Sequence, residues 1–187
     1  MIISEQSIDE KYIKEDKTIS ILKANIYAVL IMLPAVAAMI FFYTLANNRI
    51  DMTARLSETI IFFGCFIMLI VLHEWLHGFT AHFYCENKWK SIQFGVKQLT
   101  PYCHCTELLR IWQYRIVAVV PLILTGILPY GVSLICGNPL LMAISIFMVI
   151  GAGGDMMILV LLRKETSNMI VCDHPTLCGC TLYREKN

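Results

Sequence analysis

Four long apolar segments constrain this chain more than any other feature of its sequence. They contain few charged side chains and lie at about 24–46, 57–83, 113–135 and 139–162. A helix that crosses a bilayer needs about 20 predominantly apolar residues, and each segment meets that length. Charged residues make up 16% of the chain, against about 25% in a typical soluble domain. We therefore predict an all-α membrane protein with four transmembrane helices.

The positions of the basic residues predict how these helices are oriented. Of the 15 Lys and Arg residues, only Arg49 and Arg55 lie between the first and second segments. The others precede the first segment, lie in or beside the link 84–112, or follow the fourth segment. Because cytoplasmic loops carry an excess of Lys and Arg, we expect a multi-pass protein of the cell membrane with both termini and this link in the cytoplasm. The net charge of +1 implies no nucleic-acid partner.

The chain then divides into three parts. These are a cytoplasmic N-terminal tail 1–23, a transmembrane domain 24–162 and a cytoplasmic C-terminal tail 163–187. In the long link, residues 91–97 alternate polar and apolar side chains, as a strand does, and 99–105 could pair with them. We therefore predict a small β element in the cytoplasmic link between helices two and three. Such an element could bind an extended substrate by strand addition, or it could be a simple surface hairpin.

The second apolar segment contains the polar motif His73-Glu74-Trp75-Leu76-His77, of the form HExxH. Residues four apart share one face of a helix, so His73 and His77 project to the same side. Two imidazoles in this arrangement can hold one Zn²⁺, and Glu74 can reach a water on that ion as general base. Ionisable groups within a membrane are costly unless they are paired or coordinated. The motif therefore predicts metal chemistry inside the membrane.

The depths of polar residues within the predicted helices indicate a third ligand. His73 lies sixteen residues past residue 57, where the second segment begins, and Asp155 lies sixteen residues past residue 139, where the fourth begins. The two residues can be compared in depth if these two helices run in the same direction. At a rise of 1.5 Å per residue, both lie about 24 Å from the outer end. The small residues 151–154 before Asp155 allow close helix approach. We assign Asp155 as the third ligand, with a water as the fourth; its alternative role is a structural hydrogen bond between helices.

Other polar residues are weaker candidates. Glu107 and Glu86, in the long link, could each supply a carboxylate ligand instead of Asp155. His82 follows His77 by five residues and lies about 140° further round the helix, so it faces elsewhere. We expect His82 at the membrane interface or in support of the ligands.

The chain has eight cysteines. Cys65 and Cys136 lie in or near the apolar segments and are expected to be ordinary small apolar residues. The cysteines of the long link and of the C-terminal tail are cytoplasmic in the predicted topology, which disfavours disulfides, so we expect free thiols. A structural zinc shared by the Cys-x-Cys pairs at 103–105 and 178–180 is the alternative.

The segment HEWLHGFTA resembles the HExxHxxxA helix of the site-2 protease class of intramembrane zinc metalloproteases. In that class an Asp on a later transmembrane helix completes the site, a role that the resemblance gives to Asp155. No Asn-Pro-x-Pro motif precedes Asp155, and Met156 stands where that class has a glycine. HEWLHGFTAHF, the Gly-Gly-Asp ending at Asp155 and the tail motif Asp173-His174-Pro175 also resemble a bacterial family of small membrane proteins described as putative zincin peptidases.

These residues and resemblances imply a membrane-embedded zinc metalloprotease that acts on a membrane protein or peptide. His73, His77 and Asp155 would hold the zinc, and Glu74 would take a proton from the zinc-activated water and pass it to the leaving amine. One alternative is a non-catalytic metal-binding membrane protein for sensing, transport or structure, but such a protein has no need of Glu74. A second is a CAAX-type membrane metalloprotease with Glu107 as third ligand.

Overall fold

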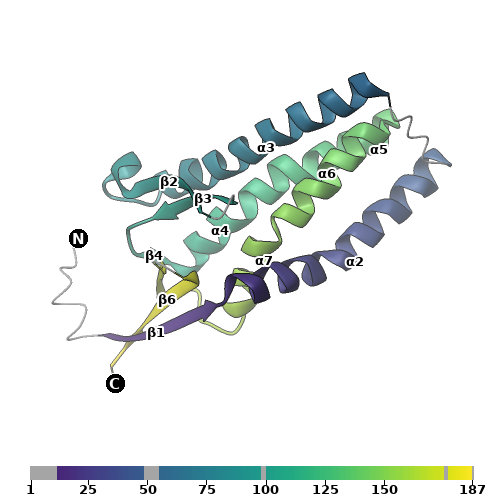
Figure 1. The fold of residues 1–187 in the computed structure, drawn as a ribbon. Coiled ribbons are helices and arrows are strands. Elements are labelled where there is room, and N and C mark those ends of the chain that lie inside the picture. Colours follow the sequence, from purple (N-terminus) through teal and green to yellow (C-terminus); the bar gives the residue numbers. More distant parts are fainter. Residues whose placement is uncertain (1–11, 49–54, 98–99, 175–176, 187) are drawn as a thin grey trace.

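The structure, a computed structural model, describes residues 12–48, 55–97, 100–174 and 177–186. Within these residues, four helical passages lie side by side along one direction (Figure 1). Each is long and apolar enough to cross a membrane. They are Leu22–Asn47, Leu56–His82, Ile111–Cys136 and Pro139–Leu161. The prediction of four long apolar helices is confirmed, and their ends differ from the predicted ends by only a few residues.

The first two passages are single helices, whereas the third and fourth are each interrupted. The helical elements are α2 (Ile21–Asn47), α3 (Leu56–His82), α4 (Ile111–Pro121), η2 (Leu122–Ile127), α5 (Leu128–Cys136), α6 (Pro139–Gly151) and α7 (Gly153–Leu161). The third passage changes pitch directly after Pro121, where η2 is a π-helix. The N–H of Leu128 bonds to the carbonyl of Ile123, five residues earlier. Such π-helical turns are rare and often occur at functional sites.

The predicted β element in the link between the second and third passages is confirmed as a hairpin. After a short 3₁₀ turn, η1 (Lys88–Ser91), strand β2 (Ile92–Lys97) pairs antiparallel with β3 (Thr100–Cys105). The hairpin packs on α3 at Gly78, where an added Cβ would lie 2.5 Å from the ring of Phe94. A side chain at this position would hold the hairpin away from the helix that carries the HExxH motif.

A second sheet joins the two tails, and the sequence analysis did not predict it. Its strands lie in the order β1-β6-β5-β4, all antiparallel. They are β1 (Tyr12–Ile19), β4 (Leu109–Arg110), β5 (Ile170–Asp173) and β6 (Cys178–Glu185). Val171 and Leu182 are fully buried and pack in one cluster with Ile111 and Leu162 of the bundle. Burial of such side chains stabilises by about 1.5–3 kcal/mol each, so this sheet is firmly attached to the helices.

Both sheets lie at the same end of the helix bundle, which we call the sheet end (Figure 1). The segment that follows β1 begins α2 there, and α7 ends there before the chain enters β5. The described part of the N-terminal tail is therefore a strand of the C-terminal sheet, hydrogen-bonded to β6 along its whole length. The tails and the long link together cover one end of the bundle.

Candidate metal centre

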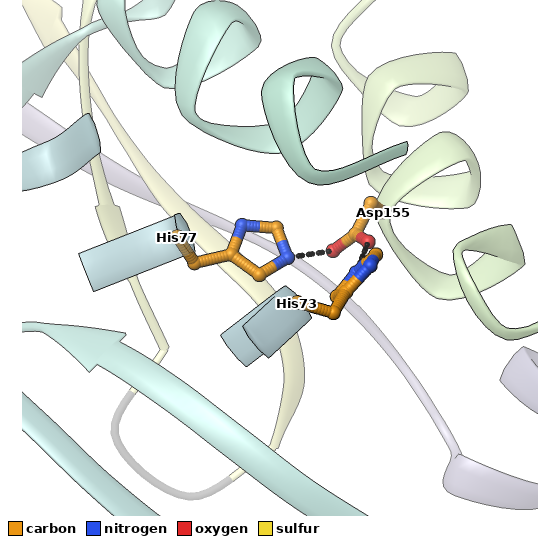
Figure 2. Close-up of side chains that lie close together, drawn as sticks. All are labelled: His73, His77 and Asp155. Atoms are coloured by element: carbon orange, nitrogen blue, oxygen red, sulfur yellow. Dashed lines mark hydrogen bonds and ion pairs between the residues drawn. The ribbon is translucent and has the colours of Figure 1, made fainter. Parts of the chain in front are cut away.

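His73 and His77 point from one face of α3 toward Asp155 of α7 (Figure 2). Nε2 of His73 lies 3.2 Å from one carboxylate oxygen of Asp155, and Nε2 of His77 lies 3.3 Å from the other. Both histidines are buried. Gly153 lets α7 pack closely in the bundle, because a Cβ there would lie 2.6 Å from the carbonyl oxygen of Ala28 on α2. The structure thus brings together the three residues that the sequence predicts as ligands.

The spacing of these donor atoms fits a tetrahedral zinc ion. Zinc bonds to His and Asp of about 2.0–2.1 Å place neighbouring ligand atoms about 3.3 Å apart. Each histidine lies at about this distance from a different oxygen of the Asp155 carboxylate, and the ligand atoms of all three residues lie within 4.8 Å of one another. Two imidazoles and one carboxylate also leave one corner of a tetrahedron open, as catalytic zinc sites do. The donor set therefore suits a catalytic rather than a structural zinc.

Each of the two imidazoles has a second contact through its other ring nitrogen. Nδ1 of His73 lies 3.1 Å from the hydroxyl oxygen of Thr125, in the π-helical turn η2. Nδ1 of His77 lies 3.0 Å from the backbone carbonyl of Val117, on α4. The third helical passage therefore supplies the partner of both rings on the side away from Asp155. Neither contact is predicted from the sequence.

A cavity of about 430 Å³ adjoins the three residues and extends toward the sheet end. Glu74 lines it together with the candidate ligands, and its other walls are largely apolar. Cys103 of β3 also lines this cavity. The predicted base, the predicted ligands and the predicted strand element thus share one cavity.

Asp173 of the C-terminal tail closes this cavity at the sheet end. Its carboxylate accepts hydrogen bonds from the hydroxyl of Tyr114 at 2.5 Å and from the backbone N–H of Cys105 at 2.9 Å. Asp173 and Tyr114 both line the cavity. The resemblance included Asp173 but implied no role for it. In the structure, its two hydrogen bonds connect the C-terminal tail to β3 and to α4.

The alternative carboxylate ligands lie away from the three residues. The carboxylate of Glu107 accepts hydrogen bonds from the backbone N–H of Glu86 at 2.7 Å, from that of Asn87 at 2.9 Å and from the hydroxyl of Ser91. It therefore organises the turn after α3, and Glu86 is itself exposed. The proposals of Glu107 or Glu86 as third ligand were wrong. His82 faces away from Asp155, as expected, and stacks on the indole of Trp89.

The described cysteines are free thiols, as expected. Sγ of Cys85 lies 3.2 Å from Sγ of Cys105 beneath the hairpin. Among the residues that the structure describes, the group of His, Cys, Asp and Glu side chains able to share an ion is His73, His77 and Asp155. The Cys-x-Cys pairs are therefore not gathered into the shared zinc site that was the alternative.

Comparison with known proteins gives one match. A family model described as "Putative zincin peptidase" matches residues 66–170, which is more than half of the chain. The match covers the HExxH motif, the hairpin, the π-helical turn and Asp155. No curated protein and no solved structure matches.

Proposed function

The chain belongs to the putative zincin peptidase family, and from this premise we propose that it is a membrane-embedded zinc metallopeptidase. It hydrolyses peptide bonds within or beside the bilayer. The observation that carries this proposal is the convergence of His73, His77 and Asp155 in one cavity with Glu74. A site that only bound metal would need the three ligands and would have no use for Glu74.

The residues that line the cavity have different roles in the proposed hydrolysis. His73, His77 and Asp155 would hold the ion, and a zinc ion bound there would polarise the scissile carbonyl and make a bound water more acidic. Glu74 accepts the proton of the attacking water and gives it to the leaving amine. The walls around these groups are largely apolar.

The substrate is a membrane protein or peptide that presents an extended segment to the cavity. Hydrogen bonds within a helix occupy its backbone groups, so a helical substrate has to unwind locally before its carbonyl is attacked. Strand β3, whose residues line one wall, is the site at which an unwound segment can add as a further strand. Since Asp173 is bonded to the N–H of Cys105, a substrate strand that pairs there displaces this carboxylate.

Metal removal tests the proposal. Membranes from cells that contain the protein should yield cleavage fragments that are absent from membranes of cells lacking its gene. Incubation with a zinc chelator should stop their production, because ligand-bound zinc is needed for hydrolysis. Addition of zinc, but not of magnesium, should restore it, because two imidazoles and a single carboxylate suit zinc, whereas magnesium prefers oxygen ligands. Fragments that persist at full rate after zinc is removed, as measured by quantitative mass spectrometry, would contradict the proposal.

We propose that the protein lies in the cell membrane with its sheet end in the cytoplasm. Trp75 and Phe79 stack at 4.9 Å on the exposed face of α3 near the sheet end, and Trp89 lies beside Trp75. Exposed aromatic side chains concentrate where a bilayer meets water. The described basic residues of the long link and of both tails lie in or beside the elements of the sheet end, which the positive-inside rule assigns to the cytoplasm.

Thiol labelling of intact cells checks this orientation. Cys136 is exposed at the end of the bundle opposite the sheets, so a membrane-impermeant maleimide should label it from outside. Burial raises the pKa of the Cys172 and Cys180 thiols to about 12, so both should react slowly. Cys136→Ser should remove the label, and an added Lys90→Cys should react only after the cells are opened. Labelling of Lys90→Cys in intact cells would place the sheet end outside.

A further inference from the structure

Pro121 leaves one backbone carbonyl of α4 without its usual helical partner. In an α-helix the carbonyl of residue 117 accepts from the N–H of residue 121, and proline has no N–H. Nδ1 of His77 lies 3.0 Å from this Val117 carbonyl oxygen. A carbonyl only accepts, so the proton of this hydrogen bond is on Nδ1 of the imidazole. In the neutral imidazole that binds a metal, the lone pair of the His77 ring is then on Nε2, the nitrogen that faces Asp155.

The hydroxyl of Thr125 likewise indicates that the proton of the His73 imidazole is on Nδ1. Its side chain is fully buried, and its hydroxyl donates to the carbonyl of Pro121 at 2.8 Å. A hydroxyl has one hydrogen, so once that hydrogen is given to Pro121 the oxygen can only accept from the imidazole. Nδ1 of His73, at 3.1 Å, is then the donor. This is the one assignment of hydrogens in which both contacts of the Thr125 hydroxyl are attractive.

The geometry of the third helical passage explains why one proline serves both rings. Residues 117, 121 and 125 are spaced by four, so they lie along one face of the passage. This face meets the face of α3 that carries His73 and His77. His77 lies beside Val117, and His73 lies beside Thr125. The change to a π-helix directly after Pro121 falls between the two contacts. The interruption of the helix and the two imidazole contacts are thus one structural feature.

We propose that Pro121 and Thr125 are positioning residues, which fix both imidazoles with the proton on Nδ1 and present both Nε2 atoms to one ion. This inference deepens the proposed function and rests on it, since it names what orients the ligands of that same site. Metal-binding histidines generally donate their second N–H to a partner, and loss of such a partner weakens metal affinity by about 10–100-fold. Neither residue belongs to the group of candidate ligands or lines the cavity.

Zinc affinity and the imidazole protons test this proposal. Thr125→Val keeps the shape of the side chain and removes the hydroxyl, so zinc affinity should fall about 10–100-fold in competition with a chromophoric chelator. Thr125→Ser, which retains the hydroxyl, should restore most of it. Ser145→Ala is the matched control, because Ser145 is also fully buried and also donates to a carbonyl four residues earlier, that of Leu141, at 2.7 Å. This control should bind zinc as the wild type does.

A second measurement uses metal-free protein labelled with ¹⁵N-histidine. The wild type should show slowly exchanging Nδ1–H protons for His73 and His77, because both are buried and hydrogen-bonded. Thr125→Val should lose the signal of His73 alone. Pro121→Ala supplies an N–H that competes for the Val117 carbonyl, so it should lose or weaken the signal of His77.

Three results would overturn the proposal. These are wild-type zinc affinity in Thr125→Val, an equal loss of affinity in Ser145→Ala, and Nδ1–H signals that do not change in either Thr125→Val or Pro121→Ala. The proton signals are read without metal, so they decide the role of Pro121 and Thr125 even if the protein were found to bind no zinc. That latter finding would instead contradict the proposed function.

Discussion

Glu74→Gln is expected to abolish peptide cleavage while zinc content and folding stay close to those of the wild type. Transfer of a proton by a positioned side chain typically contributes 10²–10⁴-fold to a rate, and the amide of glutamine cannot accept that proton. Glutamine is close to glutamate in size and polarity, so the local structure should be kept. Glu74 is about 100° round the helix from His73 and is not one of the three grouped ligands, so its loss should spare the ion.

The measurement compares cells that lack the gene and receive either the wild type or Glu74→Gln. Membrane fragments are quantified by mass spectrometry, and zinc content and thermal unfolding are measured on the purified proteins. Glu58→Gln is a suitable control, because Glu58 lies on the same helix in its first turn, at the end far from the cavity. It should cleave as the wild type does. If Glu74→Gln leaves every fragment and the cellular phenotype unchanged while His73→Ala abolishes them, the protein uses its metal without hydrolysis.

Much of the candidate site could be predicted because it depends on regular geometry. The spacing of four between His73 and His77 fixes a shared helix face, whatever the rest of the fold. Asp155 could be matched to His73 because the rise of a helix is constant and a lone carboxylate in an apolar segment needs a partner at its own depth. The contact of 3.2 Å between these two residues confirms that reasoning.

The contacts that support the site could not be predicted in the same way. The partner of His77 is the backbone carbonyl of Val117, and every residue has such a carbonyl, so the side chains give no signal. Pro121 does indicate that the helix is interrupted, but not which side chain uses the freed acceptor. Thr125 is an uncharged residue, and hydroxyls in apolar helices commonly bond to their own backbone. Its second contact, to His73, depends on how two helices pack.

The sheet formed by the tails was missed for a related reason. Strands β1 and β6 pair although almost the whole length of the chain separates them in sequence. The hydroxyl of Thr181 on β6 also donates to Asp16 on β1 at 2.8 Å. The sequence of β1 is rich in charged residues and has no clear alternation, so its periodicity does not predict a strand. Its pairing is set by the position of β6, which the packing of the helix ends determines.

His73→Ala and His77→Ala are each expected to remove zinc from the purified protein, which should otherwise carry about one ion per chain. Each substitution removes one of three protein ligands and leaves two, too few for a stable catalytic site of this kind. Asp155→Asn should weaken binding rather than abolish it, because the neutral amide keeps an oxygen in place but is a poorer zinc ligand than a carboxylate. Zinc is measured by elemental analysis after exhaustive dialysis.

His82→Ala is the matched control for these variants. It removes an imidazole from the same helix, but this ring stacks on Trp89 and is not part of the group of ligands. It should therefore retain about one zinc per chain. Asp155→Asn separates loss of a ligand from loss of the fold, because it changes the charge while preserving the size of the side chain. If His73→Ala and His77→Ala keep their zinc while substitution of the cysteines at 103–105 and 178–180 removes it, the ion is bound at the sheet end. Zinc chemistry would then have to be assigned to the thiols, and the cavity around Glu74 would lose its role in hydrolysis.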